Sequence, residues 1–305
     1  MMYLWLILGF VLLIKGADYF VEASSSIART LRVPSIIIGL TIVAFGTSAP
    51  ELAVSTTAAL SGSNDIAIGN VIGSNIFNLL VVLGACGAIR PFGVRLRWDY
   101  GASVGITAIL FLLMFFHLDI SRMDGIILLC LFSVFVGLTI RDAITNRTPA
   151  QEEGDAPHPL WLSAIFIVGG LAAIVWGGNL VVENASKIAA SFGLSQTLIG
   201  LTIVAMGTSL PELVTSIVAS RKGENGLALG NVIGSNIFNI LMVLGVSSAI
   251  SPIKINPLSL YDTAFLIGAS LIIWLWCKSK QELNRVESIF MILLYGVYMI
   301  YIMMR

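Results

Sequence analysis

The sequence predicts an all-α polytopic membrane protein with ten transmembrane helices, arranged as two inverted five-helix repeats in which helices 2 and 7 are broken. Three observations predict this fold: an apolar composition, ten apolar runs of helical length, and a match between the two halves of the chain. Of the 305 residues, 57% are hydrophobic, 11% are charged, and the mean hydropathy is +0.94. Soluble domains carry about 25% charged residues, so most of this chain is expected to lie in lipid.

Ten runs reach the roughly 20 mostly apolar residues that a transmembrane helix needs. Their approximate ranges are 3–28, 34–60, 65–89, 100–117, 123–141, 160–190, 195–220, 226–250, 261–277 and 286–304. One long connection is polar and rich in acidic residues and proline, which is typical of a surface linker. We therefore expect a first five-helix repeat at 1–141, a linker at 142–159 and a second five-helix repeat at 160–305.

The distribution of Lys and Arg predicts the orientation in the membrane, because these residues concentrate on the cytoplasmic side. The connections after odd-numbered spans hold Arg29, Arg32, Arg90, Arg95, Arg97, Arg141, Arg147, Arg221, Lys222, Lys278, Lys280 and Arg285. The opposite side holds little beyond Arg122, Lys254 and Arg305. This bias predicts a multi-pass protein of the cell membrane with a cytoplasmic central linker and both termini outside.

The chain matches itself when it is shifted by 161 residues. About two-thirds of the positions in 39–91 are identical to those in 200–252, and GNVIGSNIFN recurs at 69–78 and 230–239. Because each half holds five spans, an odd number, the halves are expected to enter the bilayer in opposite directions. Packing alone would explain repeated small residues but not repeated carboxylates.

The paired stretches AFGTSAPE (44–51) and AMGTSLPE (205–212) predict two broken helices. Pro50 and Pro211 lack an N–H, and each ring clashes with the carbonyl four residues back. A break in lipid leaves carbonyls without partners, which is tolerated only where protein or a polar cavity satisfies them. We therefore expect backbone oxygens near Ala44–Thr47 and Ala205–Thr208 to face a polar site.

Polar side chains extend this site along one face of four helices, because they recur at helical spacing. They are Ser48, Glu51 and Ser55; Ser209, Glu212 and Ser216; Asn70, Ser74 and Asn78; and Asn231, Ser235 and Asn239. All of these groups offer oxygen and none is Cys or His, which disfavours zinc and copper and suits Ca²⁺ or Na⁺.

Structural roles compete with ligation to different degrees. A glutamate within the membrane costs at least a few kcal/mol, so a purely structural role for Glu51 and Glu212 is disfavoured. Ser and Asn often hydrogen-bond between membrane helices. For Asn70, Asn75, Asn231 and Asn236 that role and ligation remain equally open. Ligation is favoured for Ser74, Asn78, Ser235 and Asn239.

The pairing of GTSAPE with GSNIFN, repeated as GTSLPE with GSNIFN, resembles the two alpha-repeats of the calcium:cation antiporter superfamily. Within it, the chain is similar to prokaryotic sodium/calcium exchangers over nearly its whole length. By matching position, the resemblance implies ion ligands at Glu51, Glu212, Thr47, Thr208, Ser48, Ser209, Ser74, Ser235, Asn78, Asn239, Ala44 and Ala205. The threonines and alanines would contribute backbone carbonyls, and the serines would contribute hydroxyls.

One residue departs from some relatives, including potassium-dependent exchangers and some archaeal ones, which carry Asp where this chain has Asn239. As a hypothesis, this departure argues against a requirement for K⁺. It also leaves two obvious acids at the centre, with a charge near −2 that one Ca²⁺ or two Na⁺ would neutralise. Competition for the same acids predicts exchange, and the resemblance implies that it is electrogenic.

The first and sixth spans are long and interrupted by glycine, and the resemblance implies that they move during transport. The closest rival function is H⁺/Ca²⁺ exchange, because a desolvated glutamate can bind a proton. A cation channel is a more distant rival, since channels generally lack an occluded, charge-balanced site. An intramembrane hydrolase is another, since the sequence offers no nucleophile–base pair or metal triad. The expected partners are Ca²⁺, Na⁺ and the lipid bilayer, with no cofactor, no nucleic acid and no obligatory protein partner. Cys86, Cys130 and Cys277 lie in apolar runs, so we expect buried thiols.

Overall fold

A computed structural model describes residues 1–93, 97–146, 158–193, 203, 205–280 and 282–304, and its fold is all-helical apart from four short strands. The first half contains α1 (Met2–Leu31), α2 (Ser35–Ile38), η1 (Gly39–Val43), α3 (Ala44–Thr47), α4 (Ala49–Leu60), α5 (Asn64–Phe77), η2 (Asn78–Val82), α6 (Leu83–Ile89), α7 (Trp98–His117) and α8 (Arg122–Thr145). The second contains α9 (Leu160–Ser191), α11 (Ala205–Gly207), α12 (Leu210–Arg221), α13 (Asn225–Phe238), η4 (Asn239–Leu244), α14 (Gly245–Ile250), α15 (Leu258–Lys280) and α16 (Arg285–Met304). The η segments are π-helical turns that continue the α-helices beside them.

The helices confirm a polytopic membrane fold. Within the described residues, eight helical segments are long and apolar enough to cross a membrane, and a bent pair, Ser35–Thr47 with Ala49–Leu60, makes a ninth. The predicted span at 195–220 begins outside the described residues, and its described part contains α11 and α12. Most observed boundaries lie within a few residues of those predicted. Helix α8 extends to Thr145, inside the range predicted for the linker.

Burial separates a central pair of spans from the peripheral ones. In the 18-residue apolar stretch of each span, the buried share is 94% for Asn225–Ile250 and 72% for Asn64–Ile89, but only 22% for Arg122–Thr145. The peripheral helices expose large apolar side chains, among them Phe116 and Val168, as lipid contact requires.

The expectation that all three cysteines are buried is wrong for one of them. Cys86 and Cys277 are buried, but Cys130 is exposed, because it lies on the outer face of α8.

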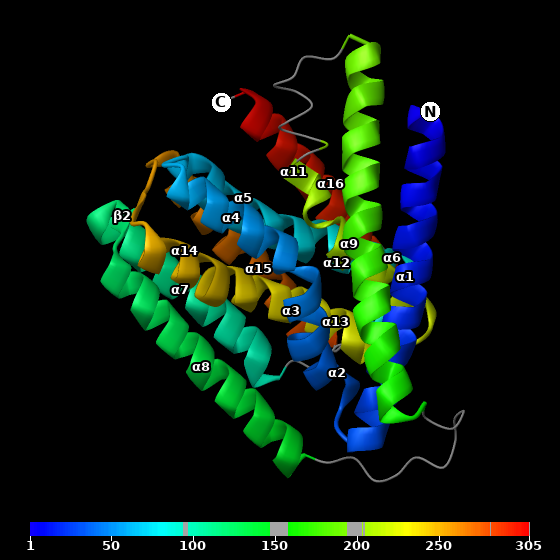
Figure 1. The fold of residues 1–305 in the computed structure, drawn as a ribbon. Helices are drawn as coiled ribbons and strands as arrows, with labels where there is room; N and C mark the ends of the chain where they lie inside the picture. Colours follow the sequence, from blue (N-terminus) through cyan, green and yellow to red (C-terminus); the bar gives the residue numbers. More distant parts are fainter. Residues whose placement is uncertain (94–96, 147–157, 194–202, 204, 281, 305) are drawn as a thin grey trace.

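Helices α1 and α9 lie side by side along one edge of the molecule (Figure 1). Two glycine pairs bring their backbones together. A Cβ on Gly9 would lie 2.9 Å from the carbonyl oxygen of Gly177, and one on Gly16 would lie 2.8 Å from that of Gly170. Small residues of this kind allow close packing between membrane helices.

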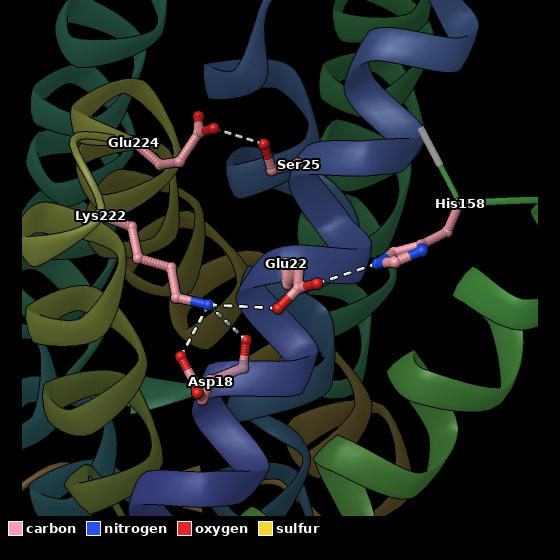
Figure 2. Close-up of polar contacts among 6 residues, drawn as sticks. All are labelled: Asp18, Glu22, Ser25, His158, Lys222 and Glu224. Carbon is pink, nitrogen blue, oxygen red and sulfur yellow. Dashed lines mark hydrogen bonds and ion pairs between the residues drawn. The ribbon is translucent and has the colours of Figure 1, made fainter. Parts of the chain in front are cut away.

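A polar contact joins α1 to the connection after α12. The Lys222 ammonium lies 2.6 Å from Asp18 Oδ1 and 3.5 Å from Glu22 Oε2, and His158 Nε2 lies 2.9 Å from Glu22 Oε1. Figure 2 shows the six residues of this α1 polar contact: Asp18, Glu22, Ser25, His158, Lys222 and Glu224. The contact connects the α1–α9 pair to the rest of the bundle.

Two short antiparallel ladders join the helix ends. Strand β1 (Phe92–Gly93) pairs with β4 (Glu282–Leu283), and β2 (Asp119–Ile120) pairs with β3 (Ile253–Lys254). The positions of β1 and β3 are related by the 161-residue shift, and each ladder joins one half of the chain to the other. The repeat is therefore present in the connections between helices as well as in the helices themselves.

Candidate cation site

Both predicted helix breaks are present, and they share one geometry. Helix α3 ends at Thr47, and Ser48, with φ −88° and ψ 9°, separates it from α4 at a bend of 47°. Thr208 and Ser209 separate α11 from α12, and Ser209 has φ −92° and ψ 5°. Pro50 and Pro211 occupy the first turns of the helices that follow, where a missing N–H costs no hydrogen bond. Each break therefore places a serine immediately before a helix whose first turn carries a glutamate.

The two glutamates are joined across the halves of the chain. Ser48 Oγ donates to Glu212 Oε1 over 2.7 Å, and Ser209 Oγ donates to Glu51 Oε1 over 3.2 Å. Ser235 Oγ also lies 3.4 Å from Glu212 Oε1. Both glutamates are fully buried, and each accepts from the serine that directly precedes the helix of the other glutamate. The structure therefore brings together the two acids that the sequence singled out.

Several predicted ligands have buried polar atoms without a hydrogen-bond partner. These atoms are Glu51 Oε2, Glu212 Oε2, Ser74 Oγ, Asn78 Oδ1 and Nδ2, and Asn239 Oδ1. A buried polar group without a partner costs about 1–3 kcal/mol, and more when it is charged. Five of these six atoms are oxygens on the four helices α4, α5, α12 and α13 and the π-turns that continue them. Such a set fits a cation that binds through oxygen.

The remaining predicted residues lie at the breaks. Thr47 is buried, Thr208 is half-buried, and their hydroxyls contact asparagines of the opposite half. The Ala44 carbonyl accepts from Ser48 N at 3.0 Å and lies 3.4 Å from Thr47 Oγ1, so hydrogen bonds within the helix engage this predicted ligand. Ala205 is the first residue of α11.

Four asparagines whose role was open from the sequence make hydrogen bonds between helices. Asn75 Nδ2 donates to the carbonyl of Asn236 at 3.1 Å, and Asn236 Nδ2 donates to that of Asn75 at 3.2 Å. Asn239 Nδ2 donates to Asn75 Oδ1, also at 3.1 Å, and Asn239 Oδ1 has no partner. Asn70 and Asn231 make the contacts with the threonines. The sequence showed asparagine at these four positions, but it did not show which groups the side chains would contact.

The chemistry of the cluster is that of a closed oxygen site. In the described ranges, no group of three or more His, Cys, Asp or Glu side chains is placed to hold a metal ion, and the cluster itself combines two carboxylates with neutral oxygens. Two surface hollows, of about 590 and 670 Å³, are lined by residues at helix ends rather than by the glutamates. Because Glu51 and Glu212 are fully buried, an ion can reach them only after a movement of the surrounding helices.

Comparison with known proteins gives a consistent result. A family model described as "Sodium/calcium exchanger protein" matches residues 1–141 and 162–304. The chain is 37% identical to inner membrane protein YrbG of Escherichia coli, over 90% of this chain and 89% of that protein. It is 34% identical to sodium/calcium exchanger MaX1 of Methanosarcina acetivorans, over 98% and 97% respectively. A solved structure of the sodium–calcium exchanger NCX_Mj, soaked with 2.5 mM Na⁺ and 0.1 mM Ca²⁺, superimposes with a TM-score of 0.85 at 32% identity, covering 97% of this chain and 96% of that one.

Proposed function

Because the chain belongs to the family of sodium/calcium exchanger proteins, and is therefore a multi-pass membrane transporter of the cation/Ca²⁺ antiport class, we propose that it exchanges Na⁺ for Ca²⁺ by alternating access at the Glu51–Glu212 site. The observation that carries this proposal is the reciprocal contact of each glutamate with the serine of the other break. It unites two carboxylates in a buried, oxygen-lined site.

Charge balance explains why such a site exchanges ions. Two carboxylates carry a charge near −2, which one Ca²⁺ or two Na⁺ neutralise. Since a net charge buried in the membrane is costly, the protein closes over the site and changes its access favourably only when cations are bound. Further Na⁺ ions would use the neutral oxygens of Ser74, Ser235, Asn78 and Asn239 and the carbonyls of the two breaks. A cycle with more than two Na⁺ per Ca²⁺ would be electrogenic.

The inverted arrangement is part of the same proposal. Ten spans, with repeats at 1–141 and 160–305 and a linker at 142–159, would place the two breaks at the same depth from opposite directions. Two observations support it: contacts such as Ser48–Glu212 and Ser209–Glu51 recur under the 161-residue shift, and so do β1 and β3. The Lys and Arg distribution then supports a cytoplasmic linker, outer termini and a location in the cell membrane.

Ion gradients provide the test. Sealed vesicles that contain the protein and are loaded with Na⁺ are expected to accumulate ⁴⁵Ca²⁺ when they are diluted into Na⁺-free buffer, and a Na⁺ ionophore should abolish the uptake. A pH gradient alone should drive none. Uptake driven by the pH gradient would establish H⁺/Ca²⁺ exchange instead, and flux without a counter-ion would indicate a channel.

The potassium hypothesis has its own measurement in the same vesicles. Because Asn239 supplies a neutral amide in place of a third acid, Na⁺-driven ⁴⁵Ca²⁺ uptake is expected to proceed equally with K⁺ or choline as the background cation. An absolute requirement for K⁺ would contradict this expectation.

Alternating access requires movement, and α1 and α9 are the proposed moving elements. They pack against each other through paired glycines, and the α1 polar contact joins them to the connection after α12 (Figure 2). A disulfide between Ser25→Cys and Glu224→Cys, whose native side chains are in contact, should therefore fix α1 to the bundle.

Oxidation of this double variant is expected to abolish exchange, and reduction should restore it. ⁴⁵Ca²⁺ bound before oxidation should be retained, because the ligands themselves are unchanged. Each single cysteine variant, treated with the same oxidant, controls for effects on Cys86, Cys130 and Cys277. Unimpaired exchange by the cross-linked protein would exclude movement of α1 at this contact.

A further inference from the structure

We propose that Asn70 and Asn231 are positioning residues, each of which holds the break of one half of the chain against the glutamate-bearing helix of the other half. This inference rests on the proposed function, since it explains how the ion site is kept in shape. Neither residue belongs to the predicted ligand set.

Asn231 lies on α13 and is fully buried. Its Nδ2 donates to Ser216 Oγ at 2.9 Å and to the carbonyl oxygen of Glu212 at 3.4 Å, both on α12. Its Oδ1 accepts from Thr47 Oγ1 at 3.1 Å, at the break in the other half of the chain. One side chain therefore connects three segments: α13, the start of α12, and the end of α3.

Asn70 repeats these contacts on α5. Its Nδ2 donates to Ser55 Oγ at 2.9 Å and to the carbonyl oxygen of Glu51 at 3.4 Å, and its Oδ1 accepts from Thr208 Oγ1 at 3.3 Å. All three partners are the counterparts of those of Asn231 under the 161-residue shift. Because the same pattern occurs in both halves, it is a feature of the repeat and not of one local packing arrangement.

The amide group suits this position because it donates two hydrogens and accepts at an oxygen. A carboxylate of the same size would lose both donated hydrogen bonds, and a leucine would lose all three. The contacts also distinguish these residues from possible ligands. Asn231 Oδ1 is engaged by a hydroxyl, whereas Asn78 Oδ1 and Asn239 Oδ1 have no partner and remain available to a cation.

The contact with threonine determines the placement of the predicted ligands. Thr47 directly precedes Ser48, whose hydroxyl donates to Glu212. Asn231 holds Thr47 on one side and the Glu212 backbone on the other, so it spans the same two segments as the Ser48–Glu212 hydrogen bond. Without the amide, the carbonyls of the break and the Glu212 carboxylate would no longer be held at one separation, and the affinity for Ca²⁺ should fall.

Equilibrium binding of ⁴⁵Ca²⁺ to the purified full-length protein tests this inference without reference to a counter-ion. Asn231→Leu, which preserves the approximate volume, is expected to raise the Kd about 30-fold, and Thr47→Val, which keeps the backbone carbonyl, about fivefold. The double variant should match Asn231→Leu, because the contact between the two side chains is already lost in that single variant.

Thr139→Val is the matched control for the threonine variant. Thr139 is also buried, but its hydroxyl donates to the Phe135 carbonyl within α8, far along the chain from the breaks, so the Kd should not change. If Asn231→Leu does not fold, Thr47→Val still carries the test. A Kd that is unchanged in Thr47→Val, or effects that multiply in the double variant, would overturn the inference. Wild-type protein that binds no Ca²⁺ would overturn the proposed function and this inference together.

Discussion

Substitution of Glu212 by glutamine is expected to reduce Na⁺-driven ⁴⁵Ca²⁺ uptake by at least about 100-fold. The substitution leaves the shape of the side chain almost unchanged but removes half of the charge that binds the cation. Removing one partner of a buried charge pair costs about 3–5 kcal/mol, and each 1.4 kcal/mol corresponds to about tenfold in affinity. The amide would also replace one of the two carboxylate oxygens by a donor, either Oε1, which accepts from Ser48 at 2.7 Å, or Oε2, which has no protein partner. Glu51→Gln should have an effect of the same size, because Glu51 has the equivalent contact with Ser209.

Glu183→Gln is the matched control for both substitutions. Glu183 occurs on a transmembrane helix, as the other two glutamates do, but its side chain is 60% exposed and pairs with Lys187 on the same helix. An exposed pair of this kind contributes little to stability, so uptake by Glu183→Gln should match the wild type. If uptake persists when both Glu51 and Glu212 are replaced, the exchange site must lie elsewhere.

The broken helices and the two acids could be predicted from the sequence because their causes are local. Pro50 and Pro211 cannot continue the helix that precedes them and instead begin a new one, and a glutamate in an apolar run requires a buried partner. The 161-residue repeat then related the two breaks to each other before any contact was known. The chain places Ser48 against Glu212 and Ser209 against Glu51, as an arrangement of two facing breaks requires.

Features that depend on long-range contacts could not be predicted in the same way. Helical periodicity places Asn70 and Asn75 on α5 but does not show that one binds a threonine and the other binds Asn236. The Lys222 contact joins residues about 200 positions apart, and no local pattern relates them. The expectation that all three cysteines are buried was wrong for Cys130, because a helix in lipid is apolar on its outer face as well as its inner one.

A second large effect of a substitution is expected where α13 packs closely against the first broken helix. A Cβ added to Gly230 would lie 2.3 Å from the carbonyl oxygen of Ile36 and 2.9 Å from the backbone nitrogen of Leu40. On the opposing side, a Cβ added to Gly39 would lie 2.5 Å from the carbonyl oxygen of Leu227. These neighbours are backbone atoms, so no side-chain rotation relieves the clash.

Gly230→Ala is therefore expected to separate the two central segments and destabilise the fold by about 3 kcal/mol or more, at the upper end of overpacking effects. Thermal unfolding of the purified protein, followed by size-exclusion chromatography, should show a large fall in Tm or a loss of folded protein, and Gly39→Ala should behave in the same way.

Alanine at an uncrowded helical glycine should not lower Tm, so the predicted loss of stability is specific to the contact of α13 with the first broken helix. A Cβ on Gly105 of α7 or Gly296 of α16 meets no described atom within 4 Å. Alanine favours a helix over glycine by up to about 1 kcal/mol, so Gly105→Ala and Gly296→Ala should leave Tm unchanged or raise it slightly. A Gly230→Ala protein as stable as these controls would show that α13 and the first broken helix do not pack backbone to backbone. The breaks would then lack the rigid support that keeps Glu51 and Glu212 within reach of one ion.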